Sequence, residues 1–366
     1  MSSGPESSEW RDLARKIECG ERLGLEDGLR LYRTTDLHGL GKLARQVRER
    51  LNGRRVFYSV NLHLNHTNIC SSACLFCSFA KGKRAPEAYA LSPAEIFTRV
   101  REAVETWHIH EVHMTGGHNP DLGLDYYLEV LGGLRSLYPG IFLKALTAPE
   151  IDDLASRSGL DAEKVLKTLK AAGLDGLPGG GAEIFDEEVR GKICPQKITA
   201  GRWLEIHGIA HRLGLVTNAT MLYGHIETDA HRVDHVLRLR DQQDATGGFQ
   251  SFIPLAYQPV ANPMRDLGAP GGVTDLKVYA VSRLLLDNIP HLKCYWVTTG
   301  LKMAQVALSF GVDDLGGTNL EERIMHEAGS GEPRDLGDED LVRLIREAGY
   351  EPCRVDSAYR PVAMHS

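Results

Sequence analysis

The sequence predicts an α/β fold, a (β/α)8 barrel of the TIM type with an N-terminal helical extension and a short C-terminal tail. Short runs rich in β-branched and aromatic residues alternate with amphipathic helical stretches, which is typical of a parallel sheet. Eight such units fill about 270 residues, the usual size of a closed barrel. Glycine-rich or polar motifs follow several strands, where a barrel places its active site.

The predicted elements follow in order. Residues 10–52 are helical and charged, and Ser92 and Glu95 form a capping box that starts a helix ending near Trp107. The eight strands are residues 55–64, 111–115, 141–146, 174–177, 215–222, 249–254, 294–297 and 312–315. Further helices include residues 199–213, 229–245, 274–287, 301–310 and 319–327, and the tail carries a helix at 339–347 and a strand at 352–355. We therefore expect an extension at residues 1–52, a barrel at 53–329 and a tail at 330–366 that packs on the barrel.

Composition narrows the class of protein. The chain has 366 residues, 42% of them hydrophobic and 25% charged, and a net charge of −7, so nothing indicates a nucleic-acid partner or an anionic membrane surface. No apolar run approaches the roughly 18 residues of a membrane span, and the polar N-terminus lacks a signal-peptide core. Four of the seven cysteines are scattered, which argues against a disulfide framework and predicts a reducing cytoplasm.

The remaining three cysteines form the most informative motif. Cys70, Cys74 and Cys77 are spaced C-x3-C-x2-C, with Phe76 directly before the last. Three close thiolates can hold three corners of a four-iron cluster and leave the fourth iron open for a reacting ligand. Three buried thiols are one alternative. A structural zinc site is another, although it usually needs four ligands in two pairs, and only His63 and His66 are placed to complete it.

This spacing resembles that of the radical S-adenosylmethionine (SAM) enzymes. The resemblance implies a [4Fe-4S] cluster whose open iron is chelated by SAM, which is then cleaved to methionine and a 5′-deoxyadenosyl radical. Thr115, Gly116 and Gly117 resemble the family's Gly-Gly-Glu-like stretch, whose backbone holds the SAM amino group, although His118 replaces the acidic residue. A simple glycine turn is the alternative. Phe76 belongs to the same expected cofactor-binding set.

Polar residues after later strands are the other candidates. Glu183, behind the run Gly179–Gly181, is expected to accept from a ribose hydroxyl or the SAM ammonium. Arg190 is expected to clamp a carboxylate with its fork of donors, unless it forms only a surface pair with Glu183. Three more candidate catalytic residues are named by position: Tyr223 and His225 after the fifth strand and Gln258 after the sixth. His225 suits acid–base work but fits a structural role equally well, and Arg283 or Lys302 could compete for the substrate.

Longer stretches, at residues 114–127, 177–185 and 218–227, resemble the menaquinone and deazaflavin branch of the superfamily. Residues 287–296 and 322–326 look most like the aminofutalosine synthase family of the futalosine route to menaquinone. The resemblance implies a transferase that adds the deoxyadenosyl radical to 3-[(1-carboxyvinyl)oxy]benzoate, an aromatic dicarboxylate. The product is 6-amino-6-deoxyfutalosine, and methionine and bicarbonate are released, so that SAM is a co-substrate.

The resemblance also implies an electron donor, a flavodoxin or a ferredoxin. Three alternatives stay open. One is the cyclic dehypoxanthine futalosine cyclase, which abstracts hydrogen, and another is the deazaflavin-cofactor synthase subunit. The third is a non-catalytic iron–sulfur or zinc scaffold.

Overall fold

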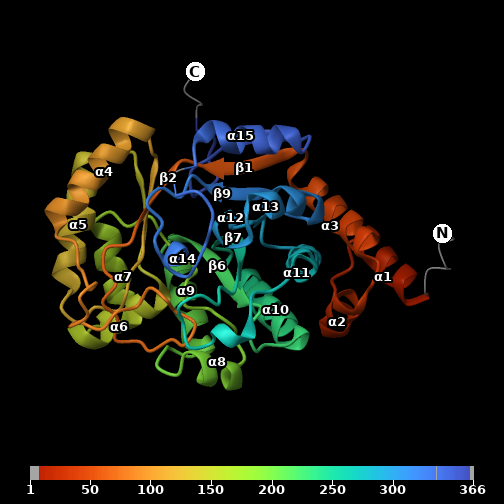
Figure 1. Ribbon diagram of the computed structural model, residues 1–366, viewed down its shortest axis with the longest axis horizontal. Coiled ribbons are helices and arrows are strands. Elements are labelled where there is room, and N and C mark those ends of the chain that lie inside the picture. Colours follow the sequence, from red (N-terminus) through yellow and green to blue (C-terminus); the bar gives the residue numbers. More distant parts are fainter. Residues whose placement is uncertain (1–7, 335, 363–366) are drawn as a thin grey trace.

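A parallel sheet of seven strands forms the centre of the protein, which is described by a computed structural model for residues 8–334 and 336–362 (Figure 1). Its strands lie side by side in chain order. They are β2 (Asn61–Leu64), β3 (Glu111–Met114), β4 (Phe142–Ala145), β5 (Gly176–Leu177), β6 (Val216–Tyr223), β7 (Phe249–Ala256) and β8 (His291–Leu292).

The two edges of this sheet are linked through the strand β9 (Asp314–Gly317) and the residues that directly follow it. A parallel bridge joins Lys293, after β8, to Asp314, and a second joins Leu62 of β2 to Leu320. Strand β9 also pairs with β1 (Arg55–Ser59), which pairs in turn with β10 (Glu351–Arg354). The predicted α/β barrel class is therefore confirmed, with a short three-stranded sheet added where the ring closes.

Helices surround the sheet (Figure 1). In chain order they are α4 (Pro93–Trp107), α5 (Leu124–Leu137), α6 (Ala148–Ser158), α7 (Ala162–Ala171), α8 (Glu187–Ile193), α9 (Ala200–Arg212), α10 (Asp229–Thr246), α11 (Gly272–Leu285), α12 (Trp296–Thr299), α13 (Leu301–Ala307), α14 (Ile324–Glu327) and α15 (Asp338–Glu347), with 3-10 turns at Arg265–Leu267 and Leu308–Phe310. The predicted capping box is confirmed, since Ser92 Oγ accepts from Glu95 N and the Glu95 carboxylate accepts from Ser92 N at 2.7 Å. Within the described residues, no helix combines the length and the apolar character needed to cross a bilayer.

The N-terminal segment forms three helices, α1 (Ser8–Cys19), α2 (Leu25–Arg33) and α3 (Leu37–Asn52). Helix α2 packs against α10 and α3 against α11, on the side of the barrel opposite α4 and α5 (Figure 1). The boundaries of extension, barrel and tail remain a prediction, because the packing joins all three segments in one hydrophobic core.

Three predicted elements differ from the structure. The strand at 55–64 is two strands, β1 and β2, interrupted at Val60. The prediction of a strand at 294–297 is wrong, because β8 lies at His291–Leu292 and the fully buried Trp296 begins the short helix α12. A brief apolar run does not distinguish a strand from a buried helix. The helix at 319–327 shrinks to α14, since Asn319 and Glu321 have positive φ angles of 50° and 59°, which a right-handed helix excludes.

Candidate active site

A cavity of about 280 Å³ lies at the carboxyl ends of the barrel strands. Most of the predicted site residues contribute to its wall: Cys70, Cys74, Cys77, Phe76, Thr115, Gly116, Gly117, Glu183 and Gln258. They come from the segments that follow β2, β3, β5 and β7. Parallel strands end at one face of a barrel, which explains why residues nearly 190 positions apart meet here.

The cysteine loop is fastened to the segment after β3. The backbone N–H of His118 donates to Cys70 Sγ at 3.4 Å, and Ser71 N donates to His118 O at 3.0 Å. All three thiols are partly buried and unpaired with one another. The start of the cysteine loop is therefore held by backbone contacts, and all three cysteines line the cavity.

Gly116 and Gly117 make this contact between the two loops possible. Gly117 N donates to Thr67 O at 2.9 Å. A Cβ atom at Gly117 would lie 2.2 Å from Ile69 O, and one at Gly116 would lie 2.8 Å from Thr67 O. Because both neighbours are backbone atoms that cannot turn aside, the close approach requires glycine at both positions. The glycine pair is thus more than a simple turn, and its main chain borders the cavity.

Lys197, which sequence reasoning missed, supplies a positive charge beside the thiols. Its ammonium pairs with the Glu183 carboxylate and lies 5.3 Å from the centroid of the Phe76 ring. Burial by itself lowers the pKa of Lys197, but the Glu183 carboxylate, and Cys74 once it is a thiolate, outweigh burial and hold that pKa above its usual value. Lys197 therefore stays protonated, as suits a site for anionic metal-bound sulfur.

The thiols fit a cluster better than a single ion. Burial raises the pKa of the Cys74 thiol to about 12, so its deprotonation must accompany metal binding. Throughout residues 8–334 and 336–362, no three His, Cys, Asp or Glu side chains converge as ligands of one metal ion. The thiolates of an iron–sulfur cluster bind separate irons and need not converge in this way. His66, considered above as a zinc ligand, is instead hydrogen-bonded through Nε2 to Tyr127.

Three predicted substrate residues do not line the cavity. The buried Arg190 guanidinium donates to the carbonyl oxygens of Gly181, Ala182, Ile184 and Ile198, so it fixes the glycine loop from behind. The Tyr223 hydroxyl is fully buried and donates to Asp275 at 2.8 Å. The His225 ring bonds Leu222 O and lies 3.1 Å from the Glu227 carboxylate. Arg283 and Lys302, the two other cations considered for the substrate, do not line the cavity either. Arg283 is fully buried, and Lys302 is exposed on α13.

Gln258 does face the cavity, although its amide nitrogen donates to Thr298 O at 2.9 Å. Several lining side chains were not predicted: His63, His113, Lys197, Asn218, Thr220, Tyr295 and Glu322. For His63, His113, Asn218 and Thr220 the available signal was a polar residue within a strand, where a barrel interior normally holds branched aliphatic side chains. Lys197, Tyr295 and Glu322 lie outside the strands and gave no such signal.

Comparison with known proteins decides the family. The model of the radical SAM superfamily matches residues 64–239, and that of the CofH/MqnC C-terminal region matches residues 246–365. The chain belongs to the radical SAM superfamily. This superfamily uses a [4Fe-4S] cluster and SAM, which agrees with the cysteine wall and the glycine backbone described above.

Curated relatives are similar to this chain over nearly its whole length. The chain is 47% identical to the aminodeoxyfutalosine synthase of Thermus thermophilus, over 96% of this chain and 95% of the relative. The corresponding enzyme of Streptomyces coelicolor is 45% identical, over 95% and 93%. The cyclic dehypoxanthine futalosine synthase of the same organism is 35% identical, over 98% and 90%. Among solved structures, methylornithine synthase superposes with a TM-score of 0.75 at 18% identity, over 93% of this chain and 97% of the other, which shows the shared fold.

Proposed function

We propose that this radical SAM protein is an aminodeoxyfutalosine synthase. The observation that carries the proposal is its 47% identity to such an enzyme along nearly the full length of both chains, compared with 35% to the cyclic dehypoxanthine futalosine synthase. The reaction joins the deoxyadenosyl carbon to the enol double bond of 3-[(1-carboxyvinyl)oxy]benzoate as the carbon–sulfur bond of SAM breaks. The aryl group migrates, and the lost carboxylate leaves with water as bicarbonate, giving 6-amino-6-deoxyfutalosine and methionine.

Different residues of the cavity wall would bind the cluster, SAM and the substrate. Cys70, Cys74 and Cys77 would hold the [4Fe-4S] cluster, which supplies the electron that cleaves SAM. The main chain of Thr115, Gly116 and Gly117 would take the SAM amino group, because a backbone without side chains lets a ligand approach closely. Phe76, Glu183 and Gln258 complete the expected contacts to SAM and substrate, since all three line the same cavity.

The chemistry of the proposed reaction indicates the partners and the cellular location of the protein. The small-molecule partner is an aromatic dicarboxylate, and a flavodoxin or ferredoxin delivers the electron. An oxygen-sensitive cluster needs a reducing compartment, so the cytoplasm is the expected location. The protein's own contribution is to position the two substrates and to exclude water from the radical step.

The decisive experiment is anaerobic reconstitution with iron and sulfide, followed by incubation with SAM, a reductant and 3-[(1-carboxyvinyl)oxy]benzoate. Mass spectrometry should detect 6-amino-6-deoxyfutalosine and methionine in equal amounts. Free 5′-deoxyadenosine without the coupled product would instead favour hydrogen abstraction, as in the cyclase. The Cys74→Ala variant should lose product formation, whereas Cys353→Ala, in β10 and outside the cavity, should retain it.

A further inference from the structure

An unusual row of polar side chains crosses the barrel interior below the cysteines. His63 of β2 stands opposite His113 of β3, and His113 stands opposite Lys144 of β4. Residues in register on neighbouring strands point to the same face of a sheet. Barrel interiors are normally filled by Val, Ile and Leu at such positions, so three adjacent polar side chains call for a ligand or a polar partner.

Lys144 has polar partners, but the two histidines have none among the residues that the structure describes. The Lys144 ammonium contacts Glu111 at 2.8 Å and Ser357 at 2.6 Å. The rings of His63 and His113 lie 4.4 Å apart, and His63 stacks on Tyr295 at 6.1 Å. Within the described part of the chain, no hydrogen bond joins a ring nitrogen of either histidine to another residue, whereas both side chains line the cavity. His63 is only 9% exposed, so little of its side chain reaches bulk solvent.

The surrounding charges keep both rings neutral. Burial lowers the pKa of His63 to about 4, with Lys144 and Lys293 acting in the same direction and Glu322 and Glu111 opposing them. Burial also holds the pKa of His113 well below its usual value, supported by His63, Lys144 and Lys293. At neutral pH each imidazole therefore offers one N–H donor and one acceptor to a ligand.

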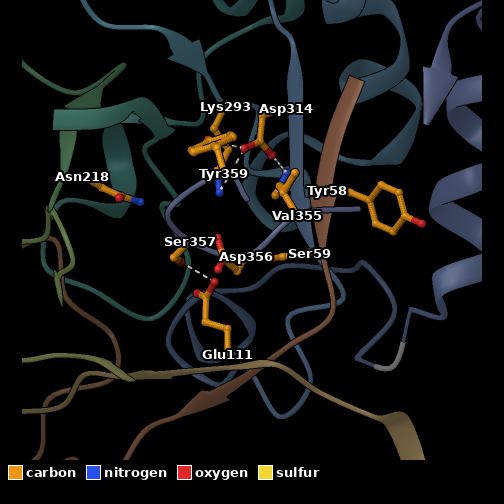
Figure 2. A pocket seen from close by; sticks show the side chains of 11 residues that line it. Tyr58, Ser59, Glu111, Asn218, Lys293, Asp314, Val355, Asp356, Ser357 and Tyr359 are labelled. Carbon is orange, nitrogen blue, oxygen red and sulfur yellow. Dashed lines mark hydrogen bonds and ion pairs between the residues drawn. The ribbon is translucent and has the colours of Figure 1, made fainter. Parts of the chain in front are cut away.

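The histidines lie deeper in the barrel than the cluster site. His63 and His113 are each one residue before the end of their strand, whereas the cysteines and the glycine pair follow the strand ends. Asn218 lines the main cavity and also the small cavity of Figure 2, which contains Glu111, Lys293 and Asp314. The row of His63 and His113 is thus the floor of the main cavity, with a charged layer beneath it.

We infer that His63 and His113 bind the carboxylate on the aromatic ring of the substrate and thereby orient the substrate in the cavity. The inference rests on the proposed function. Bond formation takes place where SAM is cleaved, beside the cysteines, so the enolpyruvyl end of the substrate must face the mouth of the barrel. The ring carboxylate, at the other end of the molecule, then points to the floor, where two neutral N–H donors have no hydrogen-bond partner among the described residues.

The test compares two ligands on the reconstituted enzyme with SAM and no reductant, so that binding is measured without turnover. One is 3-[(1-carboxyvinyl)oxy]benzoate, and the other is 2-phenoxyacrylate, which lacks only the ring carboxylate. Equilibrium dialysis should show that His63→Leu and His113→Leu weaken binding of the dicarboxylate by about 10- to 100-fold, the usual value of a hydrogen bond to a charged group. Binding of 2-phenoxyacrylate should change by about twofold or less. His63→Gln and His113→Gln, which keep an amide donor, should recover most of the affinity, and the exposed His38→Leu should have no effect.

The outcomes separate this inference from the proposed function. If the wild-type enzyme converts the dicarboxylate but the leucine variants weaken both ligands equally, or neither, the histidines do not hold the ring carboxylate. If the wild-type enzyme neither binds nor converts the dicarboxylate, the proposed function fails and the inference fails with it. The iron content of each variant, measured beside wild type, shows whether the cluster site has survived the substitution.

Discussion

The ammonium nitrogen of Lys144 lies 2.8 Å from a carboxylate oxygen of Glu111, inside the barrel, where the two side chains are only 5% and 2% exposed. The hydroxyl of Ser357 accepts from Lys144 and donates to Glu111, as the close-up of this region shows for the second contact (Figure 2). Tyr359 similarly donates to Asp314, which is 3.3 Å from Lys293. The C-terminal segment therefore closes the barrel interior by joining its buried ion pairs.

Removing one member of the Glu111–Lys144 pair should be costly. Lys144→Met leaves a buried carboxylate without its counter-charge, and such changes typically lose about 3–5 kcal/mol of unfolding free energy. The double variant Glu111→Gln with Lys144→Met carries no uncompensated charge and should regain most of the loss. Urea unfolding of the three proteins measures this, and a double variant as unstable as Lys144→Met alone would contradict the argument.

Glu150 should make stability depend on pH in the unusual direction. Burial raises the pKa of this carboxyl to about 7, although Thr147 donates to it through N and Oγ1 at 2.7 Å. The unfolded chain releases the proton near its usual pKa of 4.5, so the contribution of Glu150 to stability falls as pH rises from about 4.5 to about 7. Glu150→Gln imitates the protonated form and should leave stability nearly unchanged at pH 5 and increase it by roughly 1–3 kcal/mol at pH 8.

Urea midpoints at the two pH values measure the effect of Glu150→Gln. The exposed Glu129→Gln, in α5, is the matched control and should show the same small change at both. Equal effects of Glu150→Gln at pH 5 and pH 8 would show that Glu150 is ionised in the folded protein throughout this range.

Gly117→Ala should disrupt the site while leaving the barrel folded. Its Cβ would lie 2.2 Å from Ile69 O, so the segment after β3 must move away from the cysteine loop. We expect reduced iron loading and weaker SAM binding, with a stability loss of about 1–3 kcal/mol from the overpacked contact. Gly123→Ala, at the start of α5, meets no atom within 4 Å and should load iron as wild type does. Iron analysis after reconstitution distinguishes the two variants, and full loading of Gly117→Ala would refute the close-contact argument.

Features of the fold and the site that depend on residues close together in the sequence could be predicted, whereas those that depend on tertiary packing could not. The Ser92–Glu95 capping box depends on residues three positions apart, and the cysteine loop on spacing within eight residues, so both are visible in the sequence. The positions of Arg190 and Tyr223 after strands suggested the cavity, but chain position does not fix the direction of a side chain. The Arg190 guanidinium instead donates to four backbone carbonyl oxygens, three before α8 and one after it, so that it joins the two ends of this helix to the glycine loop.

The residues of the cavity floor could not be predicted from local sequence signals. His63 and His113 are fifty positions apart and become neighbours only through the register of β2 and β3. Lys197 reaches the cysteines from the segment between α8 and α9, a placement that no local motif encodes. Residues of this kind need the closed sheet before their function can be argued.

Lys197→Met should shift the reduction potential of the cluster to a more negative value in the reconstituted enzyme. The net charge near an iron–sulfur cluster helps to set its potential, and a nearby cation favours the reduced, more negative form. In this variant Glu183 also loses the ammonium that neutralises it, so the local charge becomes more negative by one. The double variant Lys197→Met with Glu183→Gln removes both charges and should return the potential toward that of wild type. A redox titration followed by electron paramagnetic resonance measures all three proteins, and an unchanged potential in Lys197→Met would mean that this ion pair does not influence the electronic state of the cluster.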